Sequence, residues 1–342
     1  MVEGERSADH DHSHEHGHGH DHGHAHVHGV VDPTILTTER GIWAVKWSFA
    51  GLFATALLQV VVVVLSGSVA LMADTIHNIG DAATAIPLWV AFRLQQRKPS
   101  RVYTYGLGRV EDLAGVAIVL TILVSALIAG YEAVDRLLHP QEIAYLGAVV
   151  VASVIGFIGN ELVAVFRIRI GQEIGSAALV ADGHHARVDG LTSLAVLLGA
   201  IGVWMGYPMA DPLIGLVITA AILRIVWDSG RTVLRRMLDG IDPEVLDELE
   251  EVACRTKGVS DVTEVRVRWL GHRLLAEINI TVDPELSVSD GHAIATEVRH
   301  RLLHKLRYFS DATIHVDPAT ASGEVHHCVD QHEHDDLPPH AH

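Results

Sequence analysis

The sequence is poor in cysteine. Cys254 and Cys328 are its only two among 342 residues, they lie far apart, and no Cys-x-x-Cys pair occurs. Neither a disulfide framework nor a zinc ribbon can therefore be built. Basic residues are also scarce, with 25 Lys and Arg against 42 Asp and Glu. Because phosphate contacts need clustered Lys and Arg, this composition argues against nucleic-acid binding.

The net charge of −17 is distributed unevenly. Residues 33–240 hold fifteen acidic and fifteen basic residues, so the acidic excess lies in the rest of the chain. Ten His lie between His10 and His28, and six more follow residue 325. Such low complexity predicts disordered tails at 1–38 and 319–342. Their imidazoles, beside Asp and Glu, would bind Zn²⁺ loosely and raise its local concentration.

Long apolar segments recur within residues 39–238, and each is long enough to cross the roughly 30 Å core of a bilayer. They cover residues 43–65, 69–92, 113–133, 144–166, 176–204 and 211–233. A soluble helical bundle is the alternative, but Val60–Leu65 and Ala114–Ala129 have no polar face to present to water. The sequence therefore predicts an integral membrane protein with an all-α bundle of six transmembrane helices.

Lys and Arg gather in alternate connections between these spans. They follow the second span (Arg93, Arg97, Lys98, Arg101, Arg109), the fourth (Arg167, Arg169) and the sixth (Arg231, Arg235, Arg236). The opposite connections hold only Arg136. Because Lys and Arg mark cytoplasmic loops, both termini are expected in the cytoplasm of a multi-pass protein of the plasma membrane.

Residues 239–318 have the pattern of a small soluble domain. The predicted elements are a helix at 243–256, strands at 261–270 and 274–283, a helix at 286–306 and a strand at 312–316. Asp242 is the expected N-cap of the first helix, and Ser289 or Asp290 that of the second. The order αββαβ predicts a cytosolic α+β layer.

Ionisable residues recur at membrane depth with one spacing in two spans. The second span carries Asp74, His77 and Asp81, and the fifth carries Asp182, His185 and Asp189. At i, i+3 and i+7, three residues lie within roughly 60° of one another on a helix. Each charged residue at the bilayer centre costs roughly 2.5–3.5 kcal/mol. The duplicated pattern therefore indicates a functional site rather than structural polar contacts.

Two His and two Asp from two helices supply four ligands, which suits a tetrahedral divalent ion. In each span the His and the later Asp are i, i+4 neighbours. The predicted metal ligands are His77, Asp81, His185 and Asp189. Asp74 and Asp182 lie one turn away, where metal would enter or protons would be relayed.

The ligand types also indicate which metal is bound. Without thiolates Cu(I) is disfavoured, and Mn²⁺ or Mg²⁺ would need more oxygen ligands. Zn²⁺ is therefore the predicted ion, with Co²⁺, Fe²⁺ or Cd²⁺ as alternatives.

Four other polar residues remain open at this stage. His184 points away from the charged face and is expected at the lipid edge or in a structural role. Asn160 and Glu161 in the fourth span either line the cavity or pack helices together. His272 lies in the turn between the two predicted strands, as a further ligand or as an exposed side chain.

With these residues the sequence resembles the cation diffusion facilitator family over about residues 40–318. The resemblance rests on the two His-x-x-x-Asp pairs, on Tyr105-Gly106-Leu107-Gly108-Arg109, and on Ala181-Asp182 before the second pair. It implies a six-helix metal exporter with a metallochaperone-like cytosolic domain, which works as a homodimer and exchanges cytosolic metal for external protons. It also implies that the quartet named above is the transport site, with the composition of zinc-preferring members.

The resemblance implies metal ligands in the cytosolic domain as well. They correspond to His292, His315 and Asp317, while two further ligand positions hold Glu264 and Asn279. His315 and Asp317 alternate onto one strand face, which permits joint chelation; the alternative is a solvated His beside a strand end. The family's His near the Tyr-Gly element is missing from residues 102–106, so no loop site is expected there.

The predicted function is export of a divalent metal, as a Zn²⁺/H⁺ antiporter that works by alternating access. Metal would displace protons from His77 and His185, and protons re-entering from outside would weaken these imidazole ligands. A passive metal channel and a membrane metal sensor are the alternatives. An enzyme is not expected, because four protein ligands leave no open position for an activated water.

Overall fold

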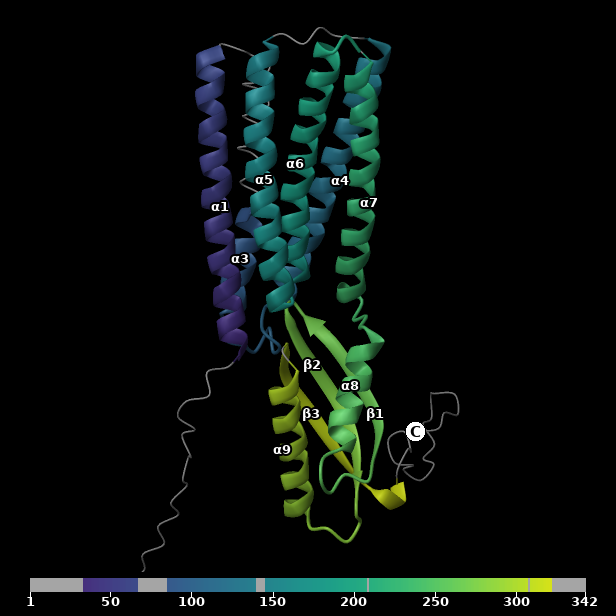
Figure 1. Ribbon diagram of the computed structural model, residues 1–342. Helices are drawn as coiled ribbons and strands as arrows, with labels where there is room; N and C mark the ends of the chain where they lie inside the picture. Colours follow the sequence, from purple (N-terminus) through teal and green to yellow (C-terminus); the bar gives the residue numbers. More distant parts are fainter. Residues whose placement is uncertain (1–32, 67–84, 140–144, 208, 307, 322–342) are drawn as a thin grey trace, which may run out of the picture. The chain divides into compact units, whose positions relative to one another are not determined.

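The computed structural model describes residues 33–66, 85–139, 145–207, 209–306 and 308–321 (Figure 1). Five helices in this part of the chain are long and apolar enough to cross a membrane. They are α1 (Pro33–Ser66), α4 (Arg109–Leu138), α5 (Leu146–Ile174), α6 (Ala177–Trp204) and α7 (Ala210–Met237). The second predicted span is described only at its end, as α3 (Ala85–Gln95). The predicted fold class, a helical transmembrane region followed by a small α+β domain, is confirmed.

The long helices run side by side and bury a core between them (Figure 1). Phe92, Ile122 and Leu179 in that core have no exposed surface. On the outside, large apolar side chains such as Leu65 and Val217 are exposed. An apolar outer surface of this kind would be a liability in water, but it suits contact with lipid acyl chains. The protein is thus an integral membrane protein.

Two helix boundaries differ most from those that the sequence predicts. α1 begins at Pro33, within the segment predicted as a tail, because the polar residues before residue 43 do not interrupt the helix. α5 continues to Ile174, although a connection was expected to follow residue 166. The placement of Arg167 in that connection is therefore wrong: its side chain is buried within the helices.

The connection between α5 and α6 is short and sharp. Gly175 adopts a left-handed conformation (φ 73°), which a glycine reaches without the steric cost of a side chain. The backbone N–H of Ser176 donates to the carbonyl of Gly171 (2.8 Å), and the Ser176 hydroxyl caps α6 by accepting from the N–H of Leu179 (3.1 Å). α5 and α6 therefore form an antiparallel hairpin whose two helices contact each other along their length.

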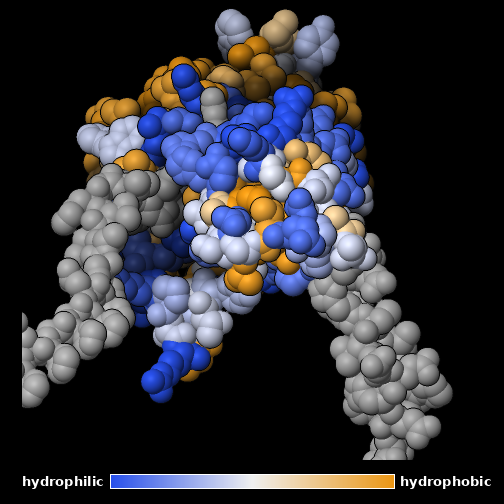
Figure 2. All heavy atoms as spheres, turned by 90° about the horizontal axis from the view of Figure 1, so that it is seen from below, coloured by the Kyte–Doolittle hydropathy of each residue, from blue (hydrophilic) through white to orange (hydrophobic). Residues whose placement is uncertain are grey.

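The C-terminal domain has the predicted αββαβ order. Its elements are α8 (Pro243–Cys254), β1 (Asp261–Leu270), β2 (Arg273–Val282), α9 (Val288–Lys305) and β3 (Phe309–Pro318). The sheet order is β1-β2-β3, with β1 antiparallel and β3 parallel to β2. α8 lies against β1 and α9 against β3, so one face of the sheet is covered and a core forms around Leu249, Ile278 and Val298. Seen from below, the surface is mostly hydrophilic, with smaller hydrophobic patches between the hydrophilic residues (Figure 2).

The two helix starts in this domain test the capping predictions. Asp242 is the N-cap of α8, and Pro243 occupies the first helical position, as predicted. The start predicted for α9, at Ser289 or Asp290, is wrong by two residues or more. Ser287 is its N-cap, because the Ser287 hydroxyl accepts from the backbone N–H of Asp290 (3.2 Å).

Candidate metal centre

α6 carries the three ionisable residues of the fifth predicted span, and all of them are buried. Asp182, His185 and Asp189 are 0%, 1% and 8% exposed. Their spacing puts them on one side of the helix. His185 Nδ1 lies 3.7 Å from Asp189 Oδ1, which is consistent with i, i+4 neighbours on adjacent turns. The structure thus collects two carboxylates and one imidazole on a buried strip of α6.

The other half of the predicted site lies outside the described residues. His77, Asp81 and Asp74 all fall between residues 67 and 84. In the part of the chain that the structure describes, no group of three or more His, Cys, Asp or Glu side chains could hold a metal ion. The α6 residues by themselves are therefore not a complete centre, and a second helix would have to supply the remaining ligands.

Arg167 is a partner of this strip that the sequence reasoning missed. Its Nη1 lies 3.0 Å from Asp182 Oδ2, with 1% and 0% of the two side chains exposed. The pair joins α5 to α6 and leaves no net charge at this point in the bundle. A signal for it exists in the sequence, because Arg167 and Asp182 are nearly equidistant from the turn at Gly175 and so face each other across an antiparallel hairpin.

A second ion pair crosses the same two helices farther from the turn. Arg187 on α6 holds Glu161 on α5 through two hydrogen bonds, Nη2 to Oε1 (2.8 Å) and Nε to Oε2 (3.2 Å). Both side chains are half-buried, and the neighbouring Asn160 is buried. This two-pronged geometry is the strong form of an Arg–carboxylate contact. Glu161, predicted to line the cavity or to pack helices, therefore links α5 to α6.

Close approach of α5 and α6 depends on a missing side chain at Gly183. A Cβ atom there would lie 2.9 Å from the backbone nitrogen of Ile168. Cβ atoms in proteins essentially never come within 3.0 Å of such an atom. Gly183 follows Asp182 directly. The close approach of the two helices at Gly183 therefore also brings Arg167 on α5 within reach of Asp182 on α6. His184, the next residue, is half-buried rather than fully enclosed.

The predicted cytosolic ligands lie on the C-terminal domain. Glu264, Asn279 and His315 are register partners on three neighbouring strands, so they form one row on the sheet. His315 Nε2 lies 2.8 Å from Asp317 Oδ1, with the His side chain 55% exposed and the Asp buried. His292 is exposed on α9. Two of the three residues proposed from the resemblance, His315 and Asp317, are therefore neighbours.

His272 is buried, so the alternative of an exposed side chain is excluded. Its Nδ1 lies 2.7 Å from Glu111 Oε2 on α4, and its Nε2 lies 3.1 Å from Thr38 Oγ1 on α1. Glu111 also accepts from Gln95 Nε2 and from the Ser176 hydroxyl, both at 2.5 Å. The β1–β2 turn is thus anchored to several helices by one buried carboxylate. Sequence reasoning missed Glu111 because its partners are far away along the chain.

The match to known families covers nearly all of the described chain. Residues 45–238 match the family described as cation efflux transmembrane domain, and residues 241–319 match the cytoplasmic domain of cation efflux proteins. The chain belongs to the cation efflux, or cation diffusion facilitator, family, as its motifs predict. Members of this family are transporters of divalent metals.

The names of two similar proteins are consistent with this family. A "Probable cation efflux system protein" of Mycobacterium tuberculosis is 53% identical over 295 residues, which is 86% of this chain and 89% of that protein. The magnetosome protein MamB of Paramagnetospirillum magneticum is 28% identical over 290 residues, covering 83% of this chain and 95% of its own. Among solved structures, a cadmium form of a MamM CTD variant is 31% identical and covers 22% of this chain and 94% of its own, with a TM-score of 0.22.

Proposed function

We propose that this protein exports Zn²⁺ from the cytosol in exchange for protons, by alternating access. The observation that carries the proposal is the strip of Asp182, His185 and Asp189, buried on α6 at membrane depth in a cation efflux protein. Co²⁺, Fe²⁺ and Cd²⁺ are the other cargoes that the same N and O ligands suit.

The charges on α6 favour different roles for its two carboxylates. Asp182 already faces the Arg167 guanidinium, so that pair is neutral without metal. His185 and Asp189 together carry one negative charge when the imidazole is neutral, and an equal contribution from His77 and Asp81 would balance a dication. We therefore assign the quartet His77, Asp81, His185 and Asp189 to the transported metal. Asp182, with Asp74, is left to the path along which metal enters or protons are relayed.

The transport cycle follows from the chemistry of imidazole. A protonated His cannot coordinate metal, so metal that arrives from the cytosol displaces protons from His77 and His185. The ion pairs Arg167–Asp182 and Glu161–Arg187 tie α5 to α6, which favours movement of these helices as one unit. When the site opens to the other side, protons return to the imidazoles and release the metal.

Transport can be measured in proteoliposomes that contain a pH-sensitive dye. We expect Zn²⁺-dependent proton flux in the wild type, and a loss of more than about tenfold in His77→Ala, His185→Ala and Asp189→Ala, since each change removes a ligand. His184→Ala is the matched control, because this neighbouring His is half-buried and points off the charged face. Comparing Zn²⁺, Co²⁺, Fe²⁺ and Mn²⁺ gives the order of preference.

The outcomes separate the alternatives. Zinc flux without proton counterflow would identify a passive channel, and zinc binding without net flux would identify a sensor. Undiminished zinc transport in both His185→Ala and Asp189→Ala would overturn the assignment of the site.

The remaining proposals concern the surroundings of the site. We assign the residues before α1 to a His-rich tail, which ends earlier than the predicted residue 38 because α1 begins at Pro33. The transmembrane domain then extends to residue 238, the cytosolic domain covers residues 239–318, and a second tail covers residues 319–342. The family's cytoplasmic domain favours a homodimer, and the distribution of Lys and Arg favours cytoplasmic termini in the plasma membrane. His292, His315 and Asp317 would form a cytosolic metal site; the 2.8 Å contact of His315 with Asp317 supports the last two.

A further inference from the structure

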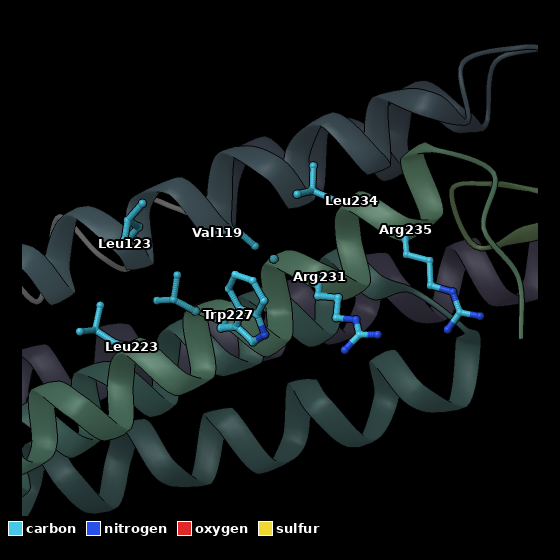
Figure 3. Close-up of a pocket in the computed structure, with 9 residues that line it drawn as sticks. Val119, Leu123, Leu223, Trp227, Arg231, Leu234 and Arg235 are labelled. Atoms are coloured by element: carbon cyan, nitrogen blue, oxygen red, sulfur yellow. The ribbon is translucent and has the colours of Figure 1, made fainter.

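A groove of about 700 Å³ lies between α4 and α7, away from the buried charged strip (Figure 3). Its walls are apolar over most of their length, with Val119 and Leu123 on α4 and Leu223 and Leu234 on α7. No part of the described chain covers Leu223 and Leu234, whose side chains are exposed. In a membrane such an apolar groove has to be filled, either by lipid acyl chains or by another protein surface.

The polar groups of the groove are confined to the end nearest the C-terminal domain. Leu223, Trp227, Arg231 and Arg235 follow one another at i, i+4 along α7, so the stripe changes from aliphatic to aromatic to cationic (Figure 3). From Leu223 to Arg231 the helix rises about 12 Å. The order matches the profile of one membrane leaflet, in which Trp lies at the level between acyl chains and headgroups.

The two arginines of this stripe differ in what they already bind. Arg235 is paired with Asp242 (Nη1 to Oδ1, 2.8 Å) and donates to the carbonyl of Ile241. Arg231 is exposed and makes no hydrogen bond or ion pair with the residues that the structure describes. A guanidinium beside an apolar surface favours an anion, and phosphate-bearing groups match its planar donors.

Charge complementarity favours a lipid over a second copy of this chain. An isologous contact through α7 would bring two copies of Arg231 toward each other. Asp228, three residues before Arg231 on α7, is already paired with Arg224 (2.9 Å). We propose that the groove is a binding site for an anionic phospholipid, with an acyl chain against Leu223, Leu123 and Trp227 and the headgroup on Arg231.

Trp227 lies within the groove and gives a direct readout, because brominated acyl chains quench tryptophan fluorescence on contact. The full-length protein is reconstituted in phosphatidylcholine vesicles that contain equal amounts of either brominated phosphatidylglycerol or brominated phosphatidylcholine. The signal of Trp227 is the difference between wild type and Trp227→Phe, which removes the contribution of the five other Trp residues.

We expect brominated phosphatidylglycerol to quench Trp227 more than brominated phosphatidylcholine does. Arg231→Gln should lower the relative association constant of the anionic lipid about fivefold, which corresponds to the ~1 kcal/mol of one basic residue at a membrane surface. Arg231→Lys should retain most of the preference. Arg169→Gln is the matched control, since Arg169 is an exposed arginine near the corresponding end of α5, and it should leave the preference unchanged.

Three results would overturn the proposal. Equal quenching of wild-type Trp227 by the two lipids would show that the groove does not select an anionic headgroup. Absence of Trp227 quenching by either lipid would show that another surface, such as a second copy of this chain, covers the groove. A preference that is unchanged in Arg231→Gln would place the headgroup elsewhere. The comparison of lipids in the wild type does not depend on the folding of any arginine variant.

Discussion

Ion pairs occur in both the helices and the C-terminal domain, at similar distances but in different surroundings. Arg167 and Asp182 are 3.0 Å apart, with 1% and 0% of their side chains exposed. Arg299 on α9 and Asp311 on β3 are 2.8 Å apart, with 49% and 57% exposed. The two pairs have the same chemistry and nearly the same length. What differs is access to water, and this decides how much each pair contributes to stability.

In the C-terminal domain, water and salt solvate the charges whether or not they are paired, so each pair contributes little. Between α5 and α6 neither charge has water to replace its partner, so removing one partner leaves an uncompensated charge. The buried Arg167–Asp182 pair therefore helps to specify how α5 and α6 fit together, while solvent can replace either partner of an exposed pair.

The largest expected effect is that of Arg167→Met. It leaves the Asp182 carboxylate buried without a counterion, and we expect a loss of about 3–5 kcal/mol in stability. The measurement is the apparent unfolding temperature of the purified protein in detergent. It is monitored as the amount of protein that remains monodisperse after heating.

The double variant Arg167→Met/Asp182→Leu tests the cause of that loss. With both charges removed, the desolvation cost disappears, and most of the lost stability should return. A double variant as unstable as Arg167→Met would show that packing, not the unpaired charge, is responsible.

A smaller effect is expected where the C-terminal domain meets the helices. His272→Ala removes the ring that lies 2.7 Å from Glu111 Oε2, and we expect a loss of about 1.5–3 kcal/mol, the range of a hydrogen bond to a charged group. The same heating assay checks it, with His300→Ala on the exposed side of α9 as the control. Equal unfolding temperatures for the two variants would argue against an anchoring role for His272.

The smallest effect is expected for Arg299→Ala. This exposed pair should contribute about 0–1 kcal/mol, and less as salt is raised. A loss comparable to that of Arg167→Met, measured in the same way, would contradict the contrast between buried and exposed pairs.

Local patterns in the sequence were reliable guides to the elements of this fold. The apolar segments correspond to α1, α4, α5, α6 and α7, and the alternation in the C-terminal domain predicted β1 and β2 to within a residue or two. Boundaries were less reliable. Arg167 was expected in the connection after the fourth span, but it lies within α5 and is buried against Asp182. An arginine at membrane depth is costly, and its partner could not be known in advance.

The candidate site was predictable in part for the same reason. The i, i+3, i+7 spacing of Asp182, His185 and Asp189 is a property of one helix, and all three residues are buried on α6. Their counterpart on the second span, His77 and Asp81, remains a prediction, because these residues lie outside the described part of the chain. The pairing of Glu161 with Arg187 joins two helices and could not be read from either one.

The sequence by itself determined the apolar spans, the order αββαβ and the composition of the charged strip, because each depends on neighbours a few residues apart. Only the tertiary structure decided that Arg167 neutralises Asp182, that Glu111 holds His272, and that no side chain in the described part of the chain pairs with Arg231. Those outcomes depend on which surfaces pack against each other. The electrostatic energy of a charged side chain depends on which groups that packing places within a few ångströms, and on whether water remains around it.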